Sequence, residues 1–189
     1  MRVKLPSVVL ATLLLLPTFA HAEERALFLQ KVYLSFCLKR FDDYAALRGE
    51  MIERGLPRLA AEQAAPFLQG QEGDAWPVPY AGQFGQFVLT LPAGDNLCAV
   101  MARRADPEST ERWFVTLAET APAPLKARQV LDETRQSPLN GEVRTRAWRW
   151  AAPAAPQQLQ LTLTTAQNPD AAIQAMVSLA LIPAEPLER

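Results

Sequence analysis

Histidine is nearly absent from this chain, which contains only His21. That residue lies at the end of an N-terminal segment with the features of a secretory signal peptide: a basic start, an apolar run over 8–16, and small residues on either side of His21. The apolar run is too short to span a bilayer as a helix. We therefore expect residues 1–22 to be a signal peptide cleaved after Ala22, which removes the histidine.

A mature chain without histidine lacks the imidazole on which many sites depend. Ser-His-Asp and Cys-His catalytic arrangements are excluded, and so are zinc sites with histidine ligands. Two cysteines alone make a poor structural zinc site. The glycines show no strand-to-helix context for a phosphate-binding loop. We expect no catalytic residue, no cofactor and no metal.

The chain also lacks an excess of positive charge. The whole chain has 19 basic and 20 acidic residues. Loss of Arg2 and Lys4 with the leader leaves 17 basic residues and a net charge of −3. Neither a polybasic cluster nor a second apolar span follows, so nothing favours nucleic acid or a membrane surface as the partner. Glu23 rather than a cysteine follows the expected cut, which argues against a lipid anchor.

The two cysteines of the chain are Cys37 and Cys98. An even number of cysteines in an exported protein predicts a disulfide, because the periplasm and the extracellular space are oxidising. The bridge would close a loop of 61 positions, for which chain entropy gives about 4 kcal/mol of stability. Two buried free thiols, or pairing between chains, are the alternatives.

The first part of the mature chain predicts helices. Residues 24–48 lack proline and glycine, and apolar residues recur at heptad spacing from Leu27, so this segment predicts one long helix. A shorter helix is expected over 57–65, which begins at a proline and is followed by another. Residues 69–82 are rich in glycine and proline and predict a loop or a short edge strand.

Apolar residues alternate along much of the remaining sequence, which predicts β-strands. Asp106 and Pro107 open a further helix as N-cap and first helical residue. Residues 128–135 suit either a strand or a helix, and a helical start near Asp170 is an alternative to part of the last strand. The expected strands are 84–91 paired with 97–103, 143–150 paired with 159–165, and 173–181.

This order of elements predicts an α+β fold. The sheet is expected to be mostly antiparallel, with a long N-terminal helix and one or two further helices packed on it. We expect residues 23–182 to form a single domain and 183–189 to form a flexible tail.

One strand carries a candidate binding face. Arg144, Arg146, Trp148 and Trp150 share one face at period two. Arginine and tryptophan are enriched at the energetic centres of protein interfaces, so these four residues form a candidate protein-binding surface. In the alternative interpretation, both tryptophans face the core and the arginines lie at its rim.

Three segments carry a resemblance to a known family. Residues 73–76, 85–91 and 96–102 resemble a family of small, uncharacterised exported proteobacterial proteins with a signal peptide and two cysteines. In that family a serine usually follows the strand cysteine, whereas Ala99 stands here. The resemblance implies export, a disulfide and an α+β fold, and it implies no activity.

The sequence therefore predicts a periplasmic or secreted protein whose partner is another protein. A non-catalytic binding module, such as an inhibitor or immunity-type factor, fits the missing catalytic groups. One alternative is a carboxylate-type hydrolase acting on cell-wall glycan. Another is a small-ligand or lipid carrier that uses a cavity between helix and sheet.

Overall fold

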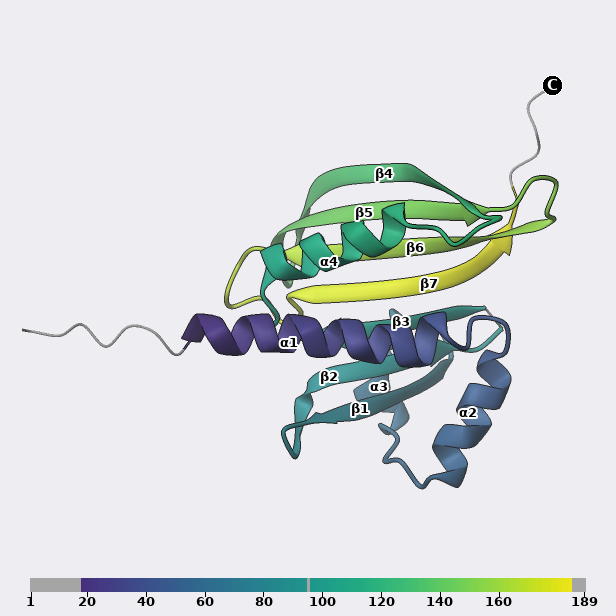
Figure 1. Ribbon diagram of the computed structural model, residues 1–189. Helices are drawn as coiled ribbons and strands as arrows, with labels where there is room; N and C mark the ends of the chain where they lie inside the picture. Colours follow the sequence, from purple (N-terminus) through teal and green to yellow (C-terminus); the bar gives the residue numbers. More distant parts are fainter. Residues whose placement is uncertain (1–17, 95, 185–189) are drawn as a thin grey trace, which may run out of the picture.

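Seven antiparallel strands form one sheet in the computed structural model of the protein, which describes residues 18–94 and 96–184 (Figure 1). The predicted α+β class with a mostly antiparallel sheet is confirmed. In chain order, the strands are β1 (Gly73–Tyr80), β2 (Gln83–Pro92), β3 (Leu97–Ala102), β4 (Lys126–Ser137), β5 (Gly141–Ala151), β6 (Gln157–Ala166) and β7 (Ala175–Pro183).

The strands belong to two meanders that meet at the centre of the sheet. The order is β1-β2-β3-β7-β6-β5-β4, so the last strand of each meander, β3 and β7, pair with one another. The two edges of the sheet are therefore β1 and β4. Both expected hairpins are confirmed as the pairs β2–β3 and β5–β6.

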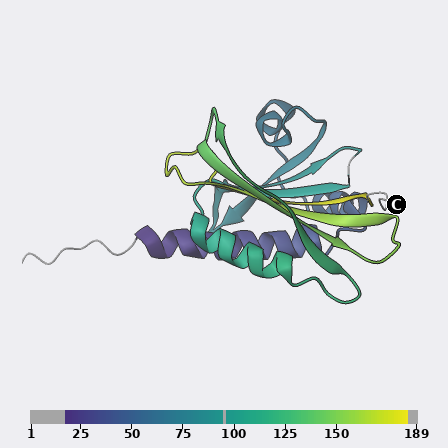
Figure 2. The ribbon, with the colours of Figure 1, turned by 90° about the horizontal axis from the view of Figure 1, so that it is seen from above.

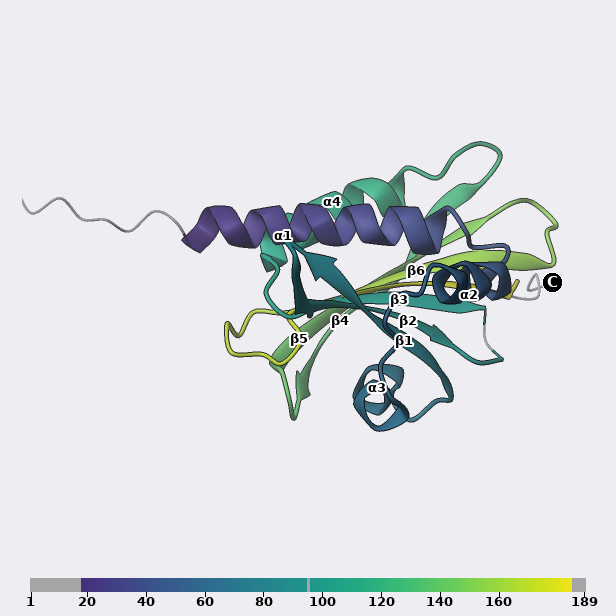
Figure 3. The same ribbon diagram turned by 90° about the horizontal axis from the view of Figure 1, so that it is seen from below.

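Helices cover the two faces of the sheet unequally. They are α1 (Thr18–Val32), the π-helix η1 (Tyr33–Leu38), α2 (Tyr44–Glu53), α3 (Ala61–Leu68) and α4 (Pro107–Glu119). Figures 2 and 3 show α1 and α4 side by side on one face and α3 on the opposite face, against β1 and β2. We call the face under α1 and α4 the helix face and the other the open face.

The prediction of one long helix over 24–48 is wrong. The chain runs as α1 and then η1 to Leu38, turns over 39–42, and begins α2 at Tyr44. Asp43 caps this new helix, because its side chain accepts a hydrogen bond from the backbone N–H of Ala46 at 2.8 Å. An aspartate in a good capping position thus outweighs the absence of proline and glycine.

Three other segments differ from the sequence predictions or settle an alternative that the sequence left open. The helix expected over 57–65 begins later, as α3, because the backbone N–H of Leu59 bonds the carbonyl of Ala75 at 2.8 Å and keeps the chain extended beside β1. Pro66 lies inside α3 rather than after it. Residues 69–82 contain the edge strand β1, and 128–135 lie in the strand β4 rather than in a helix.

The start of α4 follows the sequence prediction. Asp106 caps the helix through a hydrogen bond from the Ser109 backbone N–H at 2.7 Å, and Pro107 occupies the first helical turn. The last strand also forms as expected, as β7, and the region of Asp170 is a turn. Most of the expected tail, 183–189, lies outside the described residues.

The core lies between the helix face and the helices above it. Leu161 and Leu179, from the central strands, are fully buried there. Large side chains from all sides fill this layer: Tyr33, Trp76, Phe87 and Phe114. A smaller apolar cluster on the open face joins α3 to β1 and β2 through Ala64, Leu68, Ala75 and Val88.

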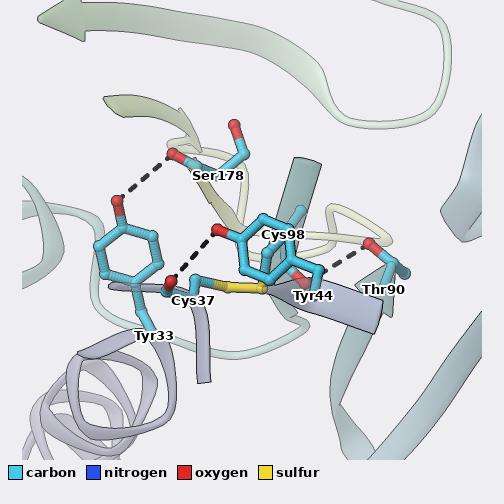
Figure 4. The surroundings of a disulfide bond; sticks show 7 residues. Tyr33, Cys37, Tyr44, Thr90, Cys98 and Ser178 are labelled. Atoms are coloured by element: carbon cyan, nitrogen blue, oxygen red, sulfur yellow. Dashed lines mark hydrogen bonds between the residues drawn. A yellow bond between two sulfur atoms is a disulfide. The ribbon is translucent and has the colours of Figure 1, made fainter. Parts of the chain in front are cut away.

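The predicted disulfide between Cys37 and Cys98 is confirmed, and it links η1 to β3 (Figure 4). Both cysteines are fully buried. The Tyr44 hydroxyl donates to the carbonyl oxygen of Cys37 at 3.1 Å, and the Tyr33 hydroxyl donates to that of Ser178 at 3.4 Å. Burial raises the pKa of both phenols, so they stay protonated as donors.

Candidate functional site

The tryptophans of the face predicted on β5 belong to the core. Trp148 and Trp150 are only 2% and 3% exposed. The Trp150 indole N–H donates to the carbonyl oxygen of Ala118 on α4 at 2.7 Å. Trp148 meets Phe114 edge-on, with ring centroids 5.8 Å apart. The four residues do share the helix face, but α4 covers its tryptophan end.

The two arginines lie at the rim of that core. Arg144 donates two hydrogen bonds to Asp132, at 2.8 and 2.9 Å, and lies 3.4 Å from a carboxylate oxygen of Glu111. The guanidinium of Arg146 lies over the Trp148 ring, 4.8 Å from its centroid. This arrangement matches the alternative interpretation, in which the tryptophans face the core and the arginines lie at its rim.

The acidic groups at this rim are held as ion-pair partners. Hydrogen bonding from Arg144 lowers the pKa of Asp132, and Asp132 in turn raises the pKa of Arg144. Glu111 also accepts a hydrogen bond from the Thr165 hydroxyl at 2.8 Å, which ties α4 to β6. A general acid needs a raised pKa, so Asp132 is not suited to that role.

The open face of the sheet has an unusual composition at its centre. The four adjacent strands β2, β3, β7 and β6 contain no Asp, Glu, Lys or Arg. Their residues on the open face alternate with core residues such as Leu161 and Leu179, and many are half-buried or buried. They are Val88, Thr90, Ala99, Met101, Gln160, Thr162, Thr164, Met176, Ser178 and Ala180.

A groove runs across this uncharged face. Two adjoining pockets of about 350 Å3 and 210 Å3 form it, and both are lined by Gln69, Met101 and Met176. We call their combined surface the sheet groove. Its floor includes Thr164 and Ser178 in addition to the two methionines.

Two segments that are distant in the sequence close the ends of the sheet groove. One end is formed by the end of α3 with Pro66 and Gln69, and the other by the last residues of β4 with the β4–β5 turn, residues 135–140. The turn is held in place because the Asn140 side-chain oxygen accepts a hydrogen bond from the backbone N–H of Ile173 at 3.0 Å. Gly141 has φ +73°, which suits the Asn140–Gly141 turn signal.

Two other surface pockets lie between helices. The larger, of about 570 Å3, lies between α1 and α4, where Leu27 is 55% exposed. The smaller, of about 250 Å3, lies between η1 and α2 and includes Ser35 and Lys39. In the smaller pocket, Glu50 pairs with both Arg40 and Arg54. This pairing neutralises part of the positive charge of the smaller pocket.

Sequence reasoning did not find the sheet groove. Its residues come from α3, from the strands β2 to β7 and from the β4–β5 turn, and their proximity depends on the strand order. The signal in the sequence was the lack of charge in β2, β3, β6 and β7, four strands that the strand order places side by side.

The comparisons with known proteins identify no relative: no family model matches the chain, and neither a curated protein nor a solved structure matches it. The described helices include none that is both long and apolar enough to cross a membrane. Within 18–94 and 96–184, no three His, Cys, Asp or Glu side chains are grouped so that they could hold a metal ion.

Proposed function

We propose that this protein is an exported, non-catalytic binding module that recognises another protein through the sheet groove. The observation that carries the proposal is the uncharged open face with a methionine floor. A solvated antiparallel sheet face is ordinarily polar, whereas the centres of protein interfaces are depleted of Lys, Glu and Asp and enriched in Met. Met101 and Met176 lie on that face among Ser, Thr, Gln and Ala.

The edges of the sheet argue that a partner docks on the face and not beside a strand. The edge strand β1 contains Pro77 and Pro79, which cannot donate to an added strand. The other edge, β4, carries five charged side chains and an irregularity between Gln129 and Leu131. Prolines, charges and bulges all oppose strand addition, so the groove is the better docking surface.

The location rests on the leader and the disulfide. The N-terminal segment has the features of a signal peptide, and disulfides form and persist in oxidising compartments. Together they support a periplasmic or secreted protein. The layer between helices and sheet is filled by large side chains such as Trp76 and Phe87. That packing disfavours a carrier with an internal cavity.

A pair of arginine variants on opposite faces tests the proposal. Ser178→Arg places a long charged side chain in the groove floor, whereas Thr116→Arg places one on the exposed surface of α4. The exported wild-type protein and both variants would be used to capture partners from periplasmic extract, followed by mass spectrometry. We expect a stoichiometric partner that Thr116→Arg retains and Ser178→Arg loses.

The same experiment distinguishes the competing surfaces. If Thr116→Arg loses the partner and Ser178→Arg keeps it, the groove between α1 and α4 is the binding surface and the proposal is wrong. Release of sugar fragments from cell-wall glycan by wild-type protein, with no partner retained, would favour the hydrolase instead. Circular dichroism of both variants checks that each still folds.

A further inference from the structure

The floor of the sheet groove consists of two rows of side chains that cross the strands. In the first row, Thr164 lies opposite Met176, which lies opposite Met101. In the second row, Ser178 lies opposite Ala99, which lies opposite Thr90. The rows are adjacent, and they run from β6 across β7 and β3 to β2. Met101, Ala99 and Thr90 are buried, whereas Thr164, Met176 and Ser178 are half-buried. The accessible groove is therefore a channel perpendicular to the strands that runs from β7 towards β4.

The length of this channel fits an extended polypeptide. Its exposed or half-buried lining begins at Arg135 on β4 and reaches Ser178 on β7, so it crosses four neighbouring strands. At about 4.8 Å between strands, the three intervals span about 14 Å. An extended chain rises about 3.3 Å per residue, so about four residues fill this length.

The polar side chains along the channel suit a main chain as their partner. Gln69, Gln136 and Asn140 carry amides, and Ser137, Thr164 and Ser178 carry hydroxyls. Amides and hydroxyls both donate and accept hydrogen bonds. Thr164 already bonds the Thr145 hydroxyl, and the Asn140 side-chain oxygen is used by Ile173. The remaining donors and acceptors can satisfy the N–H and C=O groups of an extended segment while Met176 contacts its apolar side chains.

Charge is confined to one end of the channel. Arg135 is the single charged residue among the described residues that line the two pockets. It is exposed on β4, opposite Val143 of β5. A guanidinium at the edge of an otherwise neutral groove selects a carboxylate in the ligand and fixes its direction.

We propose that the sheet groove binds an extended segment of about four residues from the partner protein, with an Asp or Glu side chain at the Arg135 end. This inference rests on the proposed function and names the part of the partner that is recognised. The apolar side chains of the segment lie over Met176. Its main chain bonds the amides and hydroxyls of the floor and of the two ends.

A peptide library tests the inference with a charge reversal. Random eight-residue segments, fixed at both ends within a phage coat protein, would be selected on the full-length protein after export and purification. Fixed ends remove any terminal carboxylate. We expect wild-type protein to enrich segments with an acidic residue next to apolar ones, and Arg135→Glu to enrich segments with Lys or Arg at that position.

Binding of one selected peptide, capped at both ends, gives the magnitude. Loss of a charge-assisted hydrogen bond lowers affinity by about tenfold to a hundredfold, so Arg135→Glu should weaken binding by at least that factor. The matched control is Arg112→Glu on the exposed surface of α4, which should leave affinity unchanged. Selected peptides without acidic residues, or equal effects of the two reversals, would overturn the inference.

The outcome also separates this inference from the proposed function. If Ser178→Arg abolishes capture of the partner protein while the library yields no binder, the groove binds a folded surface and only the extended-segment inference fails. If peptides bind in the groove but partner capture is insensitive to Ser178→Arg, the proposed function fails instead.

Discussion

The β1–β3 half of the sheet is packed on both faces, whereas the β4–β7 half is packed on one. In the first half, η1 is joined to β3 by the Cys37–Cys98 disulfide on the helix face, and α3 packs on the open face. In the second half, α4 packs on β4, β5 and β6 and η1 packs on β7, all on the helix face. The groove lies where these halves meet, with α3 at one end and the β4–β5 turn at the other.

This difference assigns separate roles to the halves. Burial on both faces and a covalent link give the first half its stability. The second half leaves a sheet face available, and that face lacks the charges that solvated strands usually carry. Changes in the first half should therefore act mainly on folding, and changes on the open face of the second half mainly on binding.

Removal of the disulfide should have the largest effect on stability. The double variant Cys37→Ala/Cys98→Ala removes the covalent link between two positions that are 61 residues apart in the sequence. We expect the free energy of unfolding to fall by about 4 kcal/mol, measured by urea denaturation. Unfolding of wild-type protein with and without a reductant provides an independent estimate. A loss below about 1 kcal/mol would mean that packing alone holds η1 on β3.

The two sides of β6 should respond very differently to truncation. Leu161 is fully buried on the helix face, so Leu161→Ala should lower the free energy of unfolding by about 3 kcal/mol. Its neighbour Thr162 is half-buried on the open face, and Thr162→Ala should cost less than about 1 kcal/mol. Equal losses in thermal unfolding would show that the open face is already packed in the free protein.

The ion pair at the rim of β4 should have the smallest effect, and one that depends on pH. Arg144 lowers the folded-state pKa of Asp132 below its ordinary value of 3.8. The contribution of the ion pair to the free energy of unfolding is therefore complete above pH 3.8, and it is lost as the pH falls through the lowered folded-state pKa. Because the Asp132 side chain is 37% exposed, the contribution should stay below about 1 kcal/mol.

Comparison with Asp132→Asn isolates that contribution. Wild-type protein should be slightly more stable than the variant at pH 7, and the two should converge well below pH 3.8 in urea denaturation. A stability difference that is independent of pH would point to packing rather than charge.

The local elements of the fold could be predicted from the sequence. Alternating apolar residues marked both hairpins and β7, and Asp106 with Pro107 marked the start of α4. The disulfide followed from the count of cysteines and the expected export. These features depend on neighbouring residues or on simple composition.

The site could not be predicted, because it depends on contacts between distant segments. The two-residue repeat of a strand correctly placed Arg144 and Trp148 on one face of β5. Only the packing of α4 decides that this face points into the core. The groove needs β3 to pair with β7, which brings Met101 opposite Met176. Nothing local in either segment specifies that pairing.

The most direct measurement of the central claim is site-specific photocrosslinking in living cells. A photoreactive benzoylphenylalanine would replace Gln69, which is exposed and lines both pockets of the groove, or Thr116 on the exposed surface of α4. The account predicts a crosslinked partner protein from position 69 and none from position 116. A crosslink to the partner from position 116 alone would contradict it.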